Sequence, residues 1–170
     1  MPNHYTNVIT VFPGHRNDDE EDDGIHDRLV ARKWLDKPLA RVMPMPAGLE
    51  GTQSPAPPGA ETNRLVREYG ASDWYEWQKL NRGCKWDAYD CDGPNAIISL
   101  PGDCGCVQIT FCTAWGPPNA EVRRRLAQEL LGEYGAGRVV WSGLQPRDDS
   151  FQAVGEWEWT PGPRLVADLA

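Results

Sequence analysis

The sequence predicts an α+β fold, in which an antiparallel sheet of the split βαββαβ type carries its helices on one face and has extra strands. Two patterns carry this prediction. Residues 106–113 alternate strictly between two faces, as a half-buried strand does, and one face holds Val107, Ile109 and Phe111. Residues 119–134 form an amphipathic helix whose apolar line consists of Val122, Leu126 and Leu130.

The first half of the chain supplies one strand and two helices. Residues 7–12 (NVITVF) are rich in β-branched side chains and end at a Pro-Gly turn, which predicts a strand. Residues 25–34 predict a short helix that Pro38 stops. Residues 71–80 predict an amphipathic helix with Ser72 as its N-cap.

The other expected strands are short and are bounded by turn residues; they cover residues 85–89, 96–100, 138–143 and 151–159. We therefore expect a single domain over residues 1–170 with two insertions. Residues 13–24 form an acidic loop, and residues 38–60 form a loop rich in proline and glycine. A sheet with helices on one face leaves its other face open, and this second loop is the segment expected to cover it. A partner surface is the rival use of that face.

The charge of the chain is concentrated in one place. The net charge is −8, but six of the 25 acidic residues lie in the run DDEEDD at residues 18–23, and without it 19 acidic residues face 17 basic ones. A solvated loop is expected for such a run, with an acidic docking loop as the alternative. The chain shows no secretory signal and no apolar run near the ~20 residues of a membrane span. We expect a cytoplasmic protein without a membrane partner.

Aromatic residues are dense between residues 74 and 118, which we expect to supply much of the core. Four stretches of the chain carry a family resemblance. They are MPNHYTNVITV (residues 1–11), VMPMPAGL (42–49), WQKLNRGCKWDAYD (77–90) and FCTAWGPP (111–118). With them the chain resembles the YubB-like proteins of phages and plasmids, although the family pattern has a small hydroxyl residue where this chain has Cys84. The resemblance implies a ferredoxin-like domain and a mobile-element origin, and it transfers no catalytic residue.

Candidate metal, acid–base and phosphate sites are weak. The five cysteines contain no CxxC pair, so ordinary thiols are expected rather than a metal site, and no cofactor is expected. Asp87, Asp90 and Asp92 miss the calcium-loop spacing, and a turn with an acidic rim is the expected structure. All three histidines lie in the first 26 residues, away from any nucleophile motif. No glycine-rich phosphate motif is present.

Nucleic acid is not expected as a partner, because the net charge is negative and RNP-type aromatic signatures are missing. The run Arg123-Arg124-Arg125 is expected to lie on a solvated helix surface, since consecutive residues fan around a helix. Exposed tryptophan and arginine are the usual anchors of protein interfaces. The candidate binding residues are therefore Arg138, Trp141, Trp157 and Trp159.

The predicted function is that of a non-enzymatic accessory protein of a phage or other mobile element, which binds a host or defence protein in the host cytoplasm. An inhibitor of a nuclease-based system, of the anti-CRISPR type, is one such protein. One alternative is an enzyme whose site is built from scattered polar residues, for example Asp87, Gln108 and Arg138. A nucleic-acid-associated accessory protein is the other.

Overall fold

The structure is a computed structural model that describes residues 4–14, 24–91, 95–102, 105–147 and 150–161. Its centre is a five-stranded sheet with the order β2-β3-β1-β4-β5, in which every neighbouring pair is antiparallel. The strands are β1 (His4–Pro13), β2 (Ile97–Ser99), β3 (Val107–Ala114), β4 (Ala136–Arg147) and β5 (Ser150–Trp159). The α+β class is thus confirmed, and β5 extends the sheet beyond β4.

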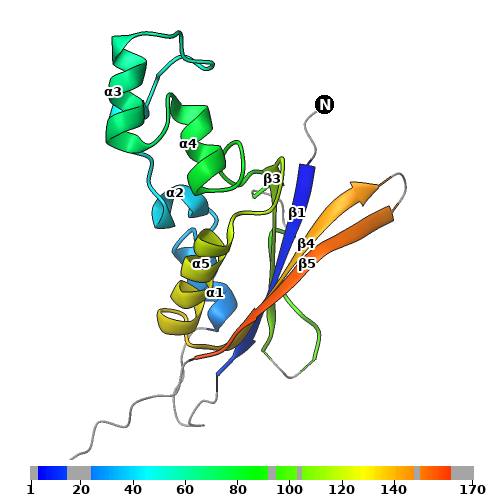
Figure 1. Cartoon of the computed structure of the whole chain (residues 1–170). Coiled ribbons are helices and arrows are strands. Elements are labelled where there is room, and N and C mark those ends of the chain that lie inside the picture. The colour runs from blue at the N-terminus through cyan, green and yellow to red at the C-terminus, as the bar shows by residue number, and fades with distance from the viewer. Residues whose placement is uncertain (1–3, 15–23, 92–94, 103–104, 148–149, 162–170) are drawn as a thin grey trace, which may run out of the picture.

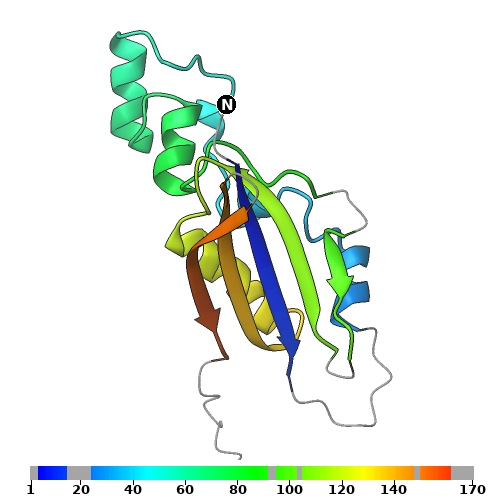
Figure 2. The same cartoon turned by 90° about the vertical axis from the view of Figure 1, so that its right-hand side faces the viewer.

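The helices lie on one side of the sheet (Figures 1 and 2). They are α1 (Ile25–Ala31), α2 (Pro38–Val42), the short 3-10 helix η1 (Ala47–Leu49), α3 (Ala60–Tyr69), α4 (Trp74–Asn81) and α5 (Ala120–Gly132). Helices α1 and α5 lie against the sheet, whereas α3 and α4 extend past one end of it (Figure 1). No described element covers the opposite face, which is turned toward the viewer in Figure 2.

The main core forms where α1 and α5 meet the inward side chains of the three central strands. Alternation along β3 and the helical line of α5 are confirmed, because all of their predicted apolar residues are buried in this cluster. Ile9 and Val11 of β1 are completely buried beside them, and so are Leu29 of α1 and Trp141 of β4. Fully burying side chains of this size contributes roughly 1.5–3 kcal/mol each.

The sequence suggested that the proline-rich segment covers the open face of the sheet, and this prediction was wrong. Pro38 begins α2 rather than only ending the preceding helix, because proline suits the first helical position, where its missing N–H needs no partner. Residues 38–60 run along the helical side, and Leu49 joins a second small core with Leu65 and Trp77. The long loop therefore belongs to a helical extension, and the open face stays free among the described residues.

Two local predictions were wrong. Asp73, not Ser72, is the N-cap of α4, and its Oδ1 accepts hydrogen bonds of 2.9 Å from the amides of Tyr75 and Glu76. Ser72 instead donates to Glu76 through its amide and its hydroxyl, at 2.6 Å each. Residues 85–89 run beside the end of β3, but they form only an isolated bridge between Tyr89 and Cys112 instead of a strand.

Candidate functional site

The predicted binding residues do not form one surface. The sheet register places Trp157 opposite Trp141 on the side covered by the helices. Trp141 is completely buried, its indole donates a 3.2 Å hydrogen bond to Asn7, and its ring packs edge-on against Phe111. A side chain without exposed surface cannot contact a partner in the folded protein, so Trp141 is corrected from a binding residue to a core residue.

Trp157 and Trp159 lie at the margin of the same core and are only partly exposed. The Trp157 ring lies across the backbone of Gly155, where a Cβ atom would come within 2.5 Å of the indole. The Arg123 guanidinium covers the Trp157 ring at 3.6 Å from its centroid. Arg123 is therefore a buried packing residue, contrary to the solvated position predicted for it, and burial lowers its pKa.

Arg138 lies on the other side of the sheet from these tryptophans. Its neighbours in β4, Val139 and Trp141, point into the core, and alternation therefore turns Arg138 toward the open face. There its guanidinium lies 3.9 Å from the centroid of the Phe12 ring and 3.9 Å from the Glu158 carboxylate. It therefore cannot act together with the three tryptophans in one contact.

Asp87 has a structural role in the helical layer. Its two carboxylate oxygens accept hydrogen bonds from the amides of Leu39 and Ala40, at 2.9 and 2.7 Å, in the first turn of α2. The guanidinium of the buried Arg82 lies 3.8 Å away. Asp87 is thus bound to the helical layer, whereas Gln108 and Arg138 both belong to strands and face the open side of the sheet.

The described cysteines lack the arrangement of a metal centre. Cys84 and Cys106 are buried, and burial raises the pKa of the Cys84 thiol to about 12. Burial also raises the pKa of Cys112. In the described part of the chain, no three histidine, cysteine or acidic side chains are grouped as ligands for a metal ion. Cys104, Asp92 and the acidic run at residues 18–23 lie outside the described residues.

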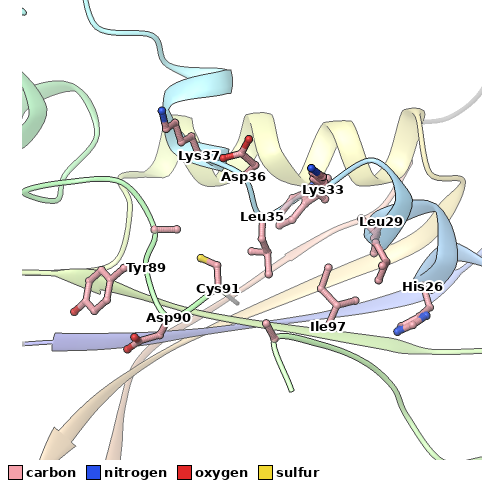
Figure 3. A pocket seen from close by; sticks show the side chains of 14 residues that line it. His26, Leu29, Lys33, Leu35, Asp36, Lys37, Tyr89, Asp90, Cys91 and Ile97 are labelled. Atoms are coloured by element: carbon pink, nitrogen blue, oxygen red, sulfur yellow. The ribbon is translucent and has the colours of Figure 1, made fainter. Parts of the chain in front are cut away.

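A groove of about 980 Å³ opens between one wall formed by α1 and the segment that links it to α2 and another formed by residues 88–91 and 96–97 (Figure 3). Its walls are apolar at Leu35 and Ile97, while its rim mixes cations such as Lys37 with the acid Asp90. Such a rim selects no single ligand charge. The groove is large enough for a small molecule, but its polar groups do not converge on one point.

A different surface gathers exposed and half-buried aromatic side chains and lysines at the end of the sheet that faces α4. We call it the aromatic–lysine surface; it consists of Tyr75, Lys79, Lys85, Trp86 and Trp115. The Lys85 ammonium lies 4.2 Å from the centroid of the Trp86 ring and 5.6 Å from that of Tyr75, and Lys79 lies 5.3 Å from the Tyr75 centroid. Trp86 is 39% exposed and Trp115 is 52% exposed.

Backbone contacts bring the parts of this surface together. The amide of Lys85 donates a 3.2 Å hydrogen bond to the carbonyl of Ala114, which places the residue before Trp86 against the residue before Trp115. Farther along, Tyr89 and Cys112 exchange backbone hydrogen bonds of 3.1 and 2.9 Å, and the Tyr89 hydroxyl contacts His4. This end of the sheet therefore joins residues 4–11, 77–90 and 111–118, which belong to three of the four stretches that carry the family resemblance.

Trp115 has an unusual backbone conformation. Its φ angle is +80°, a region that bulky residues seldom occupy, and the strain is not offset by burial of the indole. A hydrogen bond of 2.7 Å from the Thr113 hydroxyl to the carbonyl of Gly116 stabilises the turn. Thr113 in turn accepts a 2.9 Å hydrogen bond from the side-chain amide of Asn7, the partner of Trp141. A buried network therefore runs from the core to the turn that presents Trp115.

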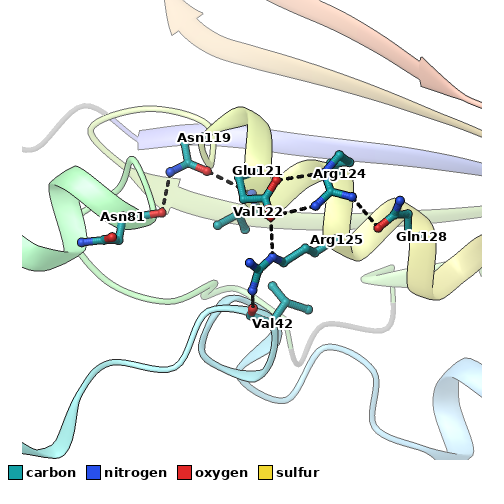
Figure 4. A network of polar contacts seen from close by, with 8 residues as sticks. All are labelled: Val42, Asn81, Asn119, Glu121, Val122, Arg124, Arg125 and Gln128. Carbon is teal, nitrogen blue, oxygen red and sulfur yellow. Dashed lines mark hydrogen bonds and ion pairs between the residues drawn. The ribbon is translucent and has the colours of Figure 1, made fainter.

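A second polar network fixes α4 and α2 relative to α5 (Figure 4). Asn119 caps α5 through a 3.0 Å hydrogen bond from Val122 and also donates to the carbonyl of Asn81 at the end of α4. Arg125 links Glu121 to the carbonyl of Val42. Hydrogen bonds from Arg124 and Arg125 lower the pKa of Glu121 to about 2. The scaffold of the aromatic–lysine surface is thus tied to the main body.

The sequence prediction missed this surface because it treated the aromatic segment as core. One signal was available in the sequence. Trp115 lies beyond the alternating run of residues 106–113 and directly precedes Gly-Pro-Pro, so it belongs to a turn. The alternation of a strand predicts which side chains are buried, and it does not apply to a large aromatic residue in a turn.

Comparison with known protein families, curated proteins and solved structures finds no match to this chain. The similarity to YubB-like proteins therefore stays a prediction. No helix within the described ranges has the length and apolar character needed to cross a membrane.

Proposed function

We propose that this protein is a non-enzymatic binding protein of a phage or other mobile element, which uses the aromatic–lysine surface to bind a host or defence protein. An inhibitor of a nuclease-based defence system, of the anti-CRISPR type, is one form of this function. The observation that carries the proposal is Trp115, whose indole is 52% exposed and whose φ angle is +80°. A strained and exposed tryptophan lowers stability on two counts, and such features occur where binding requires them.

The architecture supports a ferredoxin-like assignment, which we include in the proposal. Without β5, the strand order β2-β3-β1-β4 and the connections through α1 and α5 fit a split βαββαβ unit. Strand β5 would then be an addition at the edge of this unit. A fold of this kind supports many activities, so the functional proposal depends on the surface and not on the fold.

The chemistry of the surface fits a protein interface. Tryptophan and tyrosine are enriched among residues that dominate binding energy, because they bury a large rigid area. Trp86 and Trp115 supply two such side chains beside Tyr75. Two of the acidic and thiol groups considered above have structural roles instead, since Asp87 binds the first turn of α2 and Cys84 is buried.

The replacement Trp115→Gly separates binding from stability. Glycine accepts a φ of +80° without strain, so we expect the free energy of unfolding to stay equal or to rise by about 0.5–1 kcal/mol. Binding should weaken at least about tenfold, as expected for the loss of a central aromatic anchor. The measurements are chemical denaturation and pull-down from bacterial lysate, followed by calorimetric titration of the purified partner.

Val154→Ala is the matched control, because Val154 is 42% exposed on β5 and lies outside the aromatic–lysine surface. This variant should capture the same partner with unchanged affinity and one-to-one stoichiometry. If Trp115→Gly binds that partner as tightly as the unmodified protein does, the aromatic–lysine surface is not its binding site.

A further inference from the structure

The lysines of the aromatic–lysine surface lack acidic partners, which distinguishes them from most nearby arginines. Arg82 pairs with Asp87 at 3.8 Å, and Arg124 and Arg125 pair with Glu121 at 2.8 and 2.7 Å. Among the described residues, no carboxylate lies within the 4.0 Å ion-pair limit of Lys79 or Lys85. In a chain with a net charge of −8, two lysines that form no ion pair with a described carboxylate therefore lie beside aromatic rings.

The lysine side chains rest on the aromatic faces, in contacts that a ligand could replace. Such contacts contribute about 0.5–1 kcal/mol at exposed sites. A carboxylate from a ligand would neutralise the ammonium of Lys85 while a neighbouring side chain of the ligand packed against the ring of Trp86. Both interactions suit an extended chain that alternates acidic and apolar or aromatic groups.

A hollow of about 430 Å³ adjoins the surface at Tyr75, Lys79 and Leu80. Leu80 is 62% exposed, which makes this hollow partly apolar and gives it room for a bulky side chain. The hollow is lined by two acids, Asp73 and Glu76. Asp73 accepts the hydrogen bonds that cap α4, and Glu76 is bound by Ser72, whose hydrogen bonds lower the pKa of Glu76. Both carboxylates are thus bound mainly at the start of α4, and Glu76 attracts Lys79 electrostatically without forming an ion pair with it.

We infer that the aromatic–lysine surface recognises an acidic segment of the partner protein, whose carboxylates pair with Lys79 and Lys85 and whose apolar or aromatic side chains contact Trp86 and Trp115. This inference rests on the proposed function and names the chemistry of its partner. Charge complementarity between the two unpaired lysines and the segment is the feature that selects it.

A protein segment fits these features better than a nucleic acid does. Proteins that bind single strands combine aromatic platforms with a cationic groove that follows successive phosphates. This surface has two lysines, and the open sheet face carries neutral side chains such as Thr10, Thr110 and Ser142 on its central strands. Among the described residues, Arg138 on that face lies 3.9 Å from the Glu158 carboxylate, so it does not extend the cationic surface formed by the two lysines.

The test measures fluorescence anisotropy with a labelled peptide of eight alternating glutamate and tyrosine residues. We expect binding that weakens at least about tenfold when glutamine replaces glutamate in the peptide, a change of 1.4 kcal/mol. The double variant K79Q/K85Q should lose a similar factor, and added salt should weaken binding of the unmodified protein. Lys37→Gln, which removes one exposed lysine outside the surface, is the control and should bind normally.

Three results would overturn the inference. They are no binding of the glutamate peptide, equal binding of its glutamine counterpart, and tighter binding of an oligothymidylate, which would assign the surface to nucleic acid. The purified protein partner separates the two proposals. If K79Q/K85Q binds it normally and Trp115→Gly does not, the proposed function stands and the acidic segment is rejected. If Trp115→Gly also binds normally, both are rejected.

Discussion

Trp141 and Trp115 show how differently one residue type is used in two regions of this protein. Trp141 is completely buried on β4, with its ring against Phe111 and its indole N–H bound to Asn7. Trp115 is 52% exposed, in a turn with a φ angle of +80°. Trp141 stabilises the fold because its side chain is packed and hydrogen-bonded in the core. Trp115 lowers stability because its backbone is strained and its side chain is exposed. A high tryptophan content therefore does not say which tryptophans form the core and which form a binding surface; the position of each residue in the structure decides this.

The largest expected effect comes from the buried region. Trp141→Ala should lower the free energy of unfolding by about 3–5 kcal/mol, because it removes a large core side chain and leaves a cavity. Trp115→Ala should change it by less than about 0.5 kcal/mol, as surface substitutions usually do. Urea denaturation of both variants provides the measurement. Similar losses for the two variants would show that the contrast between these regions is wrong.

An intermediate effect is expected from the hydrogen-bond network that joins the two regions. Thr113→Val keeps the volume of the side chain but removes the donor to Gly116 and the acceptor for Asn7. A buried polar group left unsatisfied costs about 1–3 kcal/mol, so we expect a loss of that size.

The same substitution should also loosen the turn that presents Trp115. Hydrogen exchange of the backbone amides of residues 113–116, compared with the Thr113→Ser variant that keeps the hydroxyl, would report it. Unchanged stability and unchanged mobility in Thr113→Val would show that the network does not support the turn.

The smallest expected effect on stability concerns Lys85, which lies above the exposed ring of Trp86. Arg123 above the ring of Trp157 is its buried counterpart. Arg123 is 8% exposed, covers Trp157 and donates to the carbonyl of Pro118, so Arg123→Gln should cost about 1–3 kcal/mol. Lys85→Gln should cost at most about 1 kcal/mol, because Trp86 is exposed. Thermal unfolding at low and high salt would compare the two. A greater loss for Lys85→Gln would reverse the order that burial predicts.

Much of the fold was predictable because local patterns and tertiary packing agree there. The alternation of β3 and the line of Val122, Leu126 and Leu130 fix which faces are buried, and the structure confirms both. The failures occur where a tertiary contact overrides a local pattern. Residues 85–89 look like a strand, but the Asp87 side chain binds α2 and the segment bends there instead of pairing regularly with β3.

The candidate site was less predictable than the fold. Sequence alternation along β4 gives opposite faces to Arg138 and Trp141, but it does not say which face the helices cover. The aromatic–lysine surface joins residues from α4, the segment after it and the turn after β3, and only the folded chain brings them together. The proline-rich segment was also assigned to the wrong side, because its helices α2 and η1 are too short to produce a clear periodicity.

The central position of β1 has a consequence for how the chain acquires its structure. Ile9 pairs with Ile109 on one side and with Trp141 on the other, so the first strand to be synthesised waits for partners that are made much later. Folds dominated by such distant pairings are slow to form, in the range of milliseconds to seconds for small domains. During translation, β1 remains without its β4 neighbour until residues 136–147 have left the ribosome. A nascent chain that stops before β4 would therefore expose the apolar strand NVITVF to chaperones, and premature termination should yield insoluble product rather than a smaller folded domain.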